Sequence, residues 1–392
     1  MKRLRTQVGI VGSGPAGLLL GQLLHREGID SIIVEHRGRD HVIERVRAGV
    51  LEQGTVDLMH EIGVGARLRR EGLKHGGVYL RFEGQRHHID FEALTGRAIW
   101  VYGQNEVVKD LIEVRCASGR QLHFEVENVR IADFETAPGI HFRKDGEECE
   151  IACDFIAGCD GFHGICRPSI PPEKLTIYET EYPFGWLGIL AAAAPSSEEL
   201  VYSLDERGFA LFSMRSPSIT RLYLQCTPDE DLAQWPDERI WDELDARLTT
   251  RDGWRPNRGA ILQKGVTGMR SFVAEPMQCG RLFLAGDSAH IVPPTGAKGL
   301  NLAAADVYVL AQALAMYYRD GSEAPLTDYS QRCLRRVWKA QRFSWWMTSM
   351  LHRAPAANPY DYRRQLAELD YVTSSQAAMT SLAENYTGLP FD

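Results

Sequence analysis

The stretch TQVGIVGSGPAG at residues 6–17 decides the fold of this chain. Its first half is a β-branched run typical of a buried strand, and the helix-forming residues 18–25 follow its glycines. A second apolar strand is expected at 31–34, and it ends in Glu35, about 20 residues beyond the glycines. This order of strand, glycine turn, helix, strand and acid predicts a βαβ unit that binds a dinucleotide.

Each glycine of the turn has its own physical role. Gly12 allows the tight turn, Gly14 lets a pyrophosphate approach the backbone closely, and Gly17 lets the helix pack on the strand. The helix N-terminus then faces the anion with free N–H groups. Ser13 belongs to the same cofactor-binding loop, and Glu35 is expected to hold a ribose hydroxyl.

Length and composition bound the class of protein. At 392 residues the chain exceeds one ordinary core, so we expect two intertwined or consecutive domains. Hydrophobic residues make up 44% and charged residues 24%, which is typical of a folded globular protein. The net charge of −8 disfavours nucleic acid as a partner. The longest apolar run that we identify, 186–194, is shorter than the roughly 20 residues of a membrane helix, so we expect no membrane partner.

The eight cysteines form no C-x-x-C pair and no Cys/His cluster at zinc spacing. We therefore expect reduced thiols, a cytoplasmic location and no bound metal. The run Cys149, Cys153, Cys159 and Cys166 has no histidine at finger spacing, so a metal cluster is the less favoured interpretation.

The middle of the chain is rich in short strand patterns, at 199–204, 209–215 and 221–227. The Ser-Pro-Ser sequence between the last two is a turn signal, so a hairpin is expected there. Alternation along the two strands predicts faces that coincide if the strands pair, with the polar side chains of Ser213, Arg215, Arg221 and Tyr223. The pattern leaves two interpretations open, a binding site and a solvated face of the sheet.

The last third begins with a strand pattern at 281–285 that ends in the polar turn Gly286-Asp287. Such a turn aims a carboxylate at a ligand hydroxyl in some proteins, although alone it is more often structural. The glycine-rich loop 293–301 leaves N–H groups free to face an anionic ring system. Residues 329–392 look helical, and their aromatic and Met-rich face favours a core or a subunit interface over a cofactor site. A homodimer is therefore the candidate assembly.

Three segments together resemble the single-component flavoprotein aromatic hydroxylases: residues 8–17, Cys159-Asp160-Gly161 and Ala285-Gly286-Asp287. The resemblance extends through 47–54, 182–188, 289–301 and 343–349. It implies an α/β fold in which a Rossmann-like FAD-binding domain is interleaved with a β-sheet substrate domain and a helical C-terminal region. The implied division is FAD-binding at 1–75, 101–178 and 271–345, substrate domain at 76–100 and 179–270, and a helical C-terminal or interface region at 346–392.

The resemblance implies FAD as the bound cofactor and NADPH or NADH as cosubstrate. The implied reaction hydroxylates 4-hydroxybenzoate at its 3 position to give 3,4-dihydroxybenzoate, with O₂ supplying the oxygen through a flavin C4a-hydroperoxide. The implied partners are a small aromatic acid and O₂. In such a reaction the protein supplies binding, orientation and electrostatics.

The resemblance also implies roles for residues that meet the substrate. Arg215 pairs with the substrate carboxylate, and Ser213 and Tyr223 add neutral donors. A proton relay runs from Tyr202 at the substrate phenol through Tyr386 toward His75. Pro294 offers its backbone carbonyl near the same phenol. The simpler alternatives are tyrosines that only pack in the core and a His75 that is exposed.

Two further sets follow from the resemblance. Besides the glycine loop and Glu35, the residues implied for the flavin are Arg45, Arg47, Gln104, Asp160, Arg221, Asp287, Leu300 and Asn301. The residues implied for the nicotinamide cofactor are His36, Arg37, His41, His163 and Arg270.

One departure from the family pattern concerns the nicotinamide cofactor. Members strict for NADPH typically place an Arg directly after the acid of the βαβ unit and a Tyr a few residues on, whereas this chain has His36 and His41. A neutral imidazole is a weaker phosphate partner than a guanidinium. Because Arg37 keeps cationic character nearby, we expect the use of both NADPH and NADH.

Three rivals to this interpretation differ in class. A hydroxylase of another aromatic acid, such as 3-hydroxybenzoate or an aminobenzoate, would also use Arg215. A flavin disulfide reductase shares the glycine motif but needs a close cysteine pair, which the sequence does not contain. A flavin-binding sensor or dinucleotide-bound scaffold would bind FAD without any substrate-stimulated oxidation of reduced nicotinamide.

Overall fold

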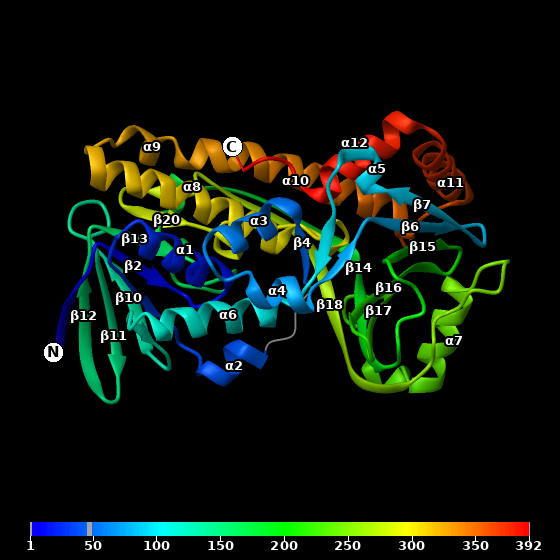
Figure 1. Cartoon of the computed structure of the whole chain (residues 1–392), viewed down its shortest axis with the longest axis horizontal. Coiled ribbons are helices and arrows are strands. Elements are labelled where there is room, and N and C mark those ends of the chain that lie inside the picture. The colour runs from blue at the N-terminus through cyan, green and yellow to red at the C-terminus, as the bar shows by residue number, and fades with distance from the viewer. Residues whose placement is uncertain (1, 45–48, 392) are drawn as a thin grey trace.

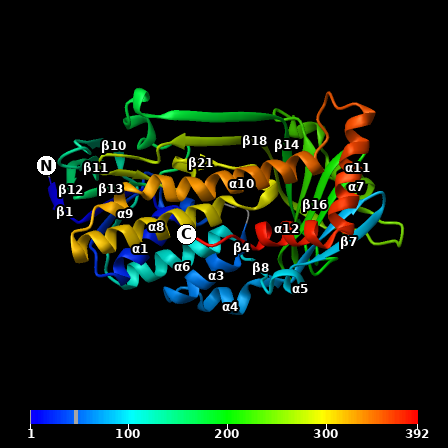
Figure 2. The same ribbon diagram turned by 90° about the horizontal axis from the view of Figure 1, so that it is seen from above.

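The computed structural model describes residues 2–44 and 49–391, and its elements form two regions that share one long helix. Figure 1 shows the nucleotide-type sheet with helices α1, α6 and α8 toward the N-terminal end of the view, and the large sheet with α7 at the other end. Helix α10 (Tyr329–Leu351) runs across both regions in Figures 1 and 2.

The six-stranded sheet has the order β19-β20-β13-β2-β3-β9 and is parallel except at β19. Its strands are β2 (Val8–Val11), β3 (Ser31–Val34), β9 (Leu122–His123), β13 (Phe155–Gly158), β19 (Gln278–Cys279) and β20 (Leu282–Leu284). Every residue of β2 and β3 is buried, as expected for inner parallel strands covered on both faces. Helix α1 (Pro15–Arg26) connects them, so the predicted βαβ unit is confirmed.

Two smaller sheets flank this region. One has the order β1-β12-β11-β10, with β1 (Lys2–Arg5), β10 (Glu127–Ala132), β11 (Gly139–Lys144) and β12 (Glu147–Ala152). The other has the order β4-β8-β5, with β4 (Val50–Glu52), β5 (Leu73–His75) and β8 (Ile99–Val101). The helices between these strands are α2 (Arg39–Glu44), α3 (Gln53–Glu61), α4 (Ala66–Glu71), α5 (Phe91–Thr95) and α6 (Gln104–Ala117).

Helix α8 (Gly299–Asp320) corrects one expectation from the sequence. Its 22 residues are long and apolar enough to cross a membrane, so the run 186–194 is not the longest apolar candidate. However, 67% of its most apolar window is buried inside the protein, and the helix packs against α1 and α10. Asp306 interrupts its apolar sequence, and other helices cover it. A buried core helix can therefore be as long and as apolar as a membrane-spanning helix.

The eight-stranded sheet has the order β21-β18-β14-β17-β16-β15-β6-β7 and is antiparallel apart from the β15–β6 pair. Its strands are β6 (Gly77–Phe82), β7 (Gln85–Asp90), β14 (Thr176–Ala192), β15 (Val201–Asp205), β16 (Gly208–Ser216), β17 (Ile219–Cys226), β18 (Ala260–Glu275) and β21 (His290–Ile291). The three strands predicted in the middle of the chain correspond to β15, β16 and β17, and the predicted hairpin joins the last two. Helix α7 (Asp237–Leu248) packs against β15 and β16.

The C-terminal region is helical as predicted, with α9 (Ala324–Thr327), α10, α11 (Pro359–Ser374) and α12 (Gln376–Thr387). Its aromatic and Met-rich face divides into two parts. Phe343, Met347 and Met350 are buried in the core, whereas Trp338 is 41% exposed and Trp345 is 57% exposed. The core interpretation holds for the first group only.

Two separate hydrophobic cores lie beneath these sheets. One is built from residues within 8–68, 102–170 and 273–340, and the other from residues within 78–101, 184–269 and 343–386. Each core draws on segments that are far apart in the sequence. This distribution supports the interleaved division into FAD-binding, substrate and C-terminal parts, which we propose with the boundaries given above.

Candidate active site

The glycine turn lies between β2 and α1 and leaves space for a ligand. Gly12 has a φ of +102°, and a Cβ there would lie 2.3 Å from the carbonyl oxygen of Cys159. A Cβ at Gly17 would lie 2.0 Å from the carbonyl oxygen of Gly12, so helix and turn touch. At Gly14, the N-cap of α1, a Cβ would meet no atom within 4 Å. The N-terminus of α1 is therefore open where an anion is favoured.

Glu35 ties this turn to the residues that follow β3. Its Oε2 accepts hydrogen bonds from the backbone N (2.9 Å) and Oγ (3.1 Å) of Ser13, and its Oε1 accepts one from the backbone N of Arg37 (2.9 Å). Nδ1 of His36 lies 3.0 Å from the same Oε1, on a side chain that is 65% exposed. His36, Arg37 and His41 are exposed together beside the turn, and Arg45 and Arg47 lie outside the described residues.

Asp160 follows β13 and lies beside Gly12. Its Oδ2 accepts a hydrogen bond from the backbone N of Cys166 (2.9 Å), while its buried Oδ1 has no partner among the residues that the structure describes. Burial raises the pKa of the Asp160 carboxyl. A buried acceptor without a partner fits a ligand that brings its own donor, such as the hydroxyl groups of a dinucleotide.

Asp287 lies on the turn after β20, where the sequence predicted it. Oδ2 of Asp306 on α8 accepts a hydrogen bond from the backbone N of Gly286 (2.9 Å) and lies 2.6 Å from Nε2 of His290. Asp306 and His290 are both 2% exposed. This buried pair therefore fixes the turn that presents Asp287.

Three further residues implied for the flavin lie at helix N-termini. Gln104 begins α6, and Leu300 and Asn301 lie in the first turn of α8. The side-chain Oδ1 of Asn301 accepts from the backbone N of Glu52 and from Oγ1 of Thr55 (both 2.9 Å), and its Nδ2 donates to two backbone carbonyls. All hydrogen-bonding groups of the Asn301 amide are used inside the protein, so only its backbone remains available to a cofactor.

A pocket of about 420 Å³ lies between the eight-stranded sheet and the loop after β21. The structure pairs Ser213 with Arg221 and Leu211 with Tyr223 across the hairpin. All four polar side chains expected on this face line the pocket, together with Tyr202, Trp186 and Pro294. The hairpin face is therefore a pocket wall, and the alternative of a solvated face is wrong.

On the cationic side of this pocket, the backbone of two glycines comes close to the guanidinium groups of Arg215 and Arg221. A Cβ at Gly103 would lie 3.3 Å from Nη1 of Arg215, and a Cβ at Gly188 would lie 2.8 Å from Nη2 of Arg221. The guanidinium of Arg221 also lies over the ring of Tyr223, with 5.1 Å between its Cζ and the ring centroid. Burial lowers the pKa of Arg215, so a carboxylate bound there would replace lost solvation.

The surroundings of Tyr202, which also lines the pocket, are neutral. Tyr202 on β15 and Tyr386 on α12 share a hydrogen bond between their hydroxyls, and each side chain is 1% exposed. Burial raises the pKa of both phenols, so both are protonated at neutral pH. His75 on β5 is also 1% exposed, and burial lowers its pKa to about 4. The alternative of an exposed His75 is therefore wrong.

The structure does not connect His75 to the tyrosine pair by direct hydrogen bonds. Neither ring nitrogen of His75 has a partner in the described part of the chain. A buried polar ring without partners is a place where water or a conformational change would have to complete the predicted relay.

His163 and Arg270 are brought together around one aromatic ring. The ring of His163 lies edge-on to that of Phe162 with 5.0 Å between centroids, and Cζ of Arg270 lies 4.8 Å from the same Phe162 centroid. Arg270 also pairs with Glu179 (3.2 Å) and Glu181 (3.4 Å) on β14. An anionic cofactor reaching Arg270 would therefore compete with two carboxylates.

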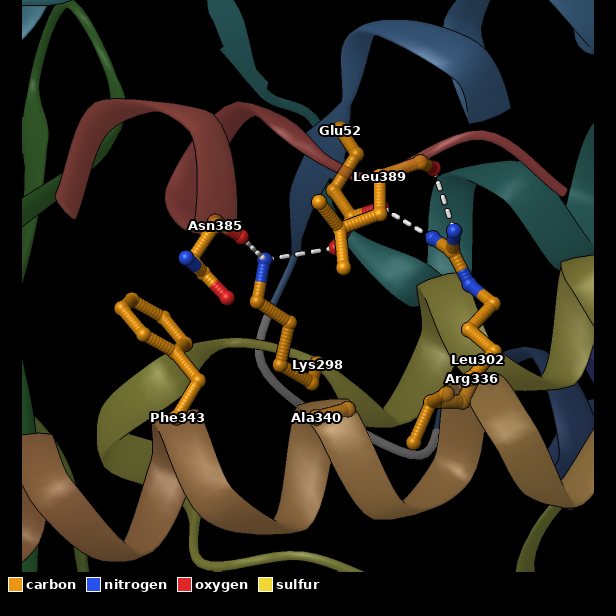
Figure 3. Close-up of a pocket in the computed structure, with 8 residues that line it drawn as sticks. All are labelled: Glu52, Lys298, Leu302, Arg336, Ala340, Phe343, Asn385 and Leu389. Atoms are coloured by element: carbon orange, nitrogen blue, oxygen red, sulfur yellow. Dashed lines mark hydrogen bonds and ion pairs between the residues drawn. The ribbon is translucent and has the colours of Figure 1, made fainter. Parts of the chain in front are cut away.

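A second cavity, of about 260 Å³, contains a buried cluster of charges that sequence reasoning missed (Figure 3). The ammonium of Lys298 lies 2.6 Å from Oε1 of Glu52 and donates to the backbone carbonyls of Asn385 and Tyr386. Glu52 and Lys298 are 2% and 4% exposed. All three ammonium hydrogens therefore have acceptors, two of them at the end of α12.

Arg336 on α10 completes this cluster. Its Nη2 lies 2.6 Å from Oε2 of Glu52, and its Nη1 donates to the carbonyls of Leu389 and Pro390. Gly388 has a φ of +106°, and a Cβ there would lie 2.3 Å from Oε2 of Glu52. The charged cluster, defined as Glu52, Lys298 and Arg336, thus anchors the chain segment that follows Tyr386.

Comparison with known proteins shows the family to which this chain belongs. Residues 5–344 match a family model described as an FAD binding domain. The chain is 50% identical to the p-hydroxybenzoate hydroxylase of Acinetobacter baylyi over 100% of this chain and 97% of that protein. It is 27% identical to a 3-(3-hydroxy-phenyl)propionate/3-hydroxycinnamic acid hydroxylase of a Mycobacterium species, over 79% of this chain and 54% of that protein.

Among solved structures, the fold is similar to that of p-nitrophenol 4-monooxygenase from Pseudomonas putida DLL-E4. The TM-score is 0.85 at 19% sequence identity, and the match covers 99% of each chain. The open N-terminus of α1 and the unpartnered oxygen of Asp160 fit the FAD that the family model implies. The chain therefore belongs to the single-component FAD-dependent aromatic hydroxylases, the family of flavoprotein monooxygenases that includes the relative from Acinetobacter baylyi.

Proposed function

We propose that this enzyme is a 4-hydroxybenzoate 3-monooxygenase. In this reaction 4-hydroxybenzoate, O₂, NADPH or NADH and one proton give 3,4-dihydroxybenzoate, the oxidised nicotinamide and water. FAD, when bound, carries the two electrons from the nicotinamide to O₂ and delivers one oxygen atom to the ring. The 50% identity to a p-hydroxybenzoate hydroxylase over the full chain supports this substrate.

One observation carries the proposal: Arg215 and Tyr202 line the same pocket. A para-hydroxylated benzoate has an anionic group and a phenol at opposite ends of one ring. The planar guanidinium of Arg215 matches a carboxylate through two parallel hydrogen bonds, and Ser213 and Tyr223 lie beside it as neutral donors. The pocket thus has a cationic side and a neutral phenolic side.

At the phenolic side the two tyrosines are suited to hold a proton. Because both phenols are protonated at neutral pH, Tyr202 donates to the substrate oxygen while Tyr386 supports Tyr202. Ionisation of the substrate phenol makes the ring carbon beside it more nucleophilic. Before ionisation the backbone carbonyl of Pro294, which also lines the pocket, would accept from the substrate hydroxyl. The phenol proton would pass to Tyr202 as Tyr202 passes its own to Tyr386, and His75 would receive the proton beyond Tyr386.

The cofactor residues are proposed on the geometry of the nucleotide-type region. The open N-terminus of α1 would take the pyrophosphate, Glu35 the ribose and Asp160 and Asp287 the hydroxyl groups between them and the ring. Arg221 would support the flavin from the pocket side. The cluster of Phe162, His163 and Arg270, with the exposed His36, Arg37 and His41, is proposed for the nicotinamide cofactor.

Both nicotinamides are proposed as cosubstrates because an exposed imidazole follows Glu35. For the assembly we propose a homodimer that covers the exposed Trp338 and Trp345 of α10. For the location we propose the cytoplasm, since all eight cysteines are free thiols.

The test is oxidation of NADPH and of NADH by the FAD-loaded enzyme, with and without 4-hydroxybenzoate, with chromatography of the product. We expect substrate-stimulated turnover and 3,4-dihydroxybenzoate with both nicotinamides. Stimulation only by 3-hydroxybenzoate or an aminobenzoate would move the assignment to another aromatic acid, and no stimulation by any acid would overturn hydroxylation as the function.

A further inference from the structure

Trp186 forms part of the pocket wall from the middle of β14. Its indole ring lies 4.7 Å from the ring of Tyr223 and stacks on Phe209 at 5.1 Å with planes 8° apart. The plane of the indole therefore shapes the space next to the carboxylate side of the pocket. If the indole of Trp186 rotated, the pocket would accept different ring substituents.

One buried histidine holds the edge of this indole. Nε1 of Trp186 donates a hydrogen bond of 2.7 Å to Nε2 of His352, which is 3% exposed. The two ring planes are nearly parallel, with 13° between them, and the hydrogen bond joins the edges of the two rings. Phe184 and Phe209 contact the imidazole as stacked rings at 4.8 and 4.3 Å.

The hydrogen bonds of His352 admit one state of its ring. An indole N–H is only a donor, so Nε2 of His352 must be an acceptor, and the ring proton lies on Nδ1. Nδ1 lies 3.0 Å from the carbonyl oxygen of Thr348, which is only an acceptor. A protonated imidazole would turn an N–H toward the indole N–H, and burial lowers the pKa of His352 to about 3. The ring is therefore neutral in a fixed tautomer.

The same turn of α10 also contacts the loop that contains Pro294. Oγ1 of Thr348 is placed to donate its one proton either to Oγ1 of Thr295 (2.9 Å) or to the carbonyl oxygen of Ser344 (2.7 Å). Thr295 adjoins Pro294, which lines the pocket. The end of α10 thus sets the positions of two pocket walls, one through His352 and one through Thr348.

We propose that His352 is a positioning residue for substrate selection: its neutral Nε2 fixes the plane of Trp186 and thereby the width of the aromatic acid pocket. This inference rests on the proposed function, because the pocket selects among ring substituents only if an aromatic acid binds there. His352 itself does not line the pocket.

The test compares two variants of His352 with the wild-type enzyme by equilibrium binding and by turnover. His352→Phe keeps the aromatic stack but removes the acceptor, whereas His352→Gln keeps an acceptor near the position of Nε2. The ligands are 4-hydroxybenzoate and the bulkier 4-hydroxy-3-methylbenzoate, measured by calorimetry on the FAD-loaded enzyme. We expect His352→Phe to reduce the preference for 4-hydroxybenzoate by about 10-fold, since one methyl group in a fitted pocket is worth about that factor, and His352→Gln to restore most of it.

A double-mutant cycle separates positioning from loss of stability. Trp186→Phe removes the donor, so adding His352→Phe to it should change the preference no further. The near-ultraviolet circular dichroism difference between wild type and His352→Phe should likewise be absent in the Trp186→Phe background. Trp346→Phe is the matched control, because its indole N–H bonds to Glu368 outside the pocket, and it should leave the preference unchanged.

The outcomes are distinct from those that test the function. If the wild type binds neither acid, the proposed function fails and this inference with it. If the wild type discriminates between the acids and His352→Phe discriminates equally well, only the role of His352 is overturned. If adding His352→Phe to Trp186→Phe reduces the preference for 4-hydroxybenzoate further, the role of His352 is likewise overturned.

Discussion

Two buried polar groups join the C-terminal helices to the rest of this enzyme, and they do so by opposite means. The charged cluster of Glu52, Lys298 and Arg336 uses two cations on one carboxylate. The neutral group of Tyr202, Tyr386, Trp186 and His352 uses hydrogen bonds between uncharged partners and stacked rings. Both groups are almost fully excluded from water.

The difference follows from what each group must leave free. The charged cluster caps backbone carbonyls at the end of α12, where no ligand needs to enter, so its charges are matched within the protein. The neutral group borders the pocket, where Arg215 is proposed to bind the carboxylate of the substrate. Because these border residues are uncharged, they do not cancel the electrostatic field in the pocket before the substrate binds.

The largest effect is predicted for Glu52→Gln, which disrupts the charged cluster. This change leaves Lys298 and Arg336 buried without an anion, so we expect the free energy of unfolding to fall by about 3–5 kcal/mol. Chemical denaturation measures the change. Arg258→Gln is the control, because Arg258 is 48% exposed in its pairs with Asp242 and Asp245 and should cost less than about 1 kcal/mol. Equal costs for the two variants would contradict the interpretation of the cluster.

The next effect is predicted for Tyr202→Phe, which breaks the neutral chain at the substrate. Removal of its hydroxyl leaves Tyr386 without its partner and the substrate phenol without its donor. We expect the yield of hydroxylated product to fall by about 10²-fold while flavin reduction continues, with H₂O₂ formed instead. The ratio of product to nicotinamide oxidised measures this uncoupling. Tyr371→Phe, on an exposed side chain of α11, should leave the ratio unchanged, and a coupled Tyr202→Phe enzyme would refute the role of the chain.

Arg215→Lys sharpens the comparison from the cationic side of the pocket. An ammonium keeps the charge but loses the paired fork of two N–H groups. We expect the Kd for 4-hydroxybenzoate to rise by about 10- to 100-fold, in line with the 1.5–3 kcal/mol of a hydrogen bond between charged groups. Titration calorimetry measures it, and an unchanged Kd would show that the carboxylate binds elsewhere.

The nucleotide-type region was predictable because its signal is local. Gly12, Gly14 and Gly17 lie within six residues: backbone contacts exclude a Cβ at Gly12 and Gly17, whereas at Gly14 the space stays open for a ligand. The strands β2 and β3 were found for the same reason, since an inner parallel strand is apolar throughout. Helix α8 is as apolar as a membrane segment because its window is 67% buried inside the protein, and length and composition alone do not separate these two cases.

The pocket was only half predictable because its parts come from distant segments. The hairpin face could be derived from alternation on two adjacent strands, and Ser213 and Arg221 are indeed paired. The charged cluster joins residues 52, 298 and 336, and no spacing rule relates them. One signal was present: a lysine inside an otherwise apolar glycine loop suggests a buried counter-ion. The roles of Tyr202 and Tyr386 came from family resemblance, because a single buried tyrosine carries no pattern.

The smallest predicted effect tests whether the neutral group depends on pH. The pKa of His352 is lowered to about 3 in the folded protein, below the ordinary value of 6.5. The unfolded chain therefore binds one more proton between these values, so the stabilising contribution is complete above pH 6.5 and is lost as pH falls toward 3. One such group contributes a slope of up to about 1.4 kcal/mol per pH unit. His352→Gln should lower the slope of unfolding free energy between pH 5 and 6.5 by about that amount, which chemical denaturation at a series of pH values measures. An unchanged slope in His352→Gln would mean that the imidazole beside Trp186 is already charged, which its hydrogen bonds forbid.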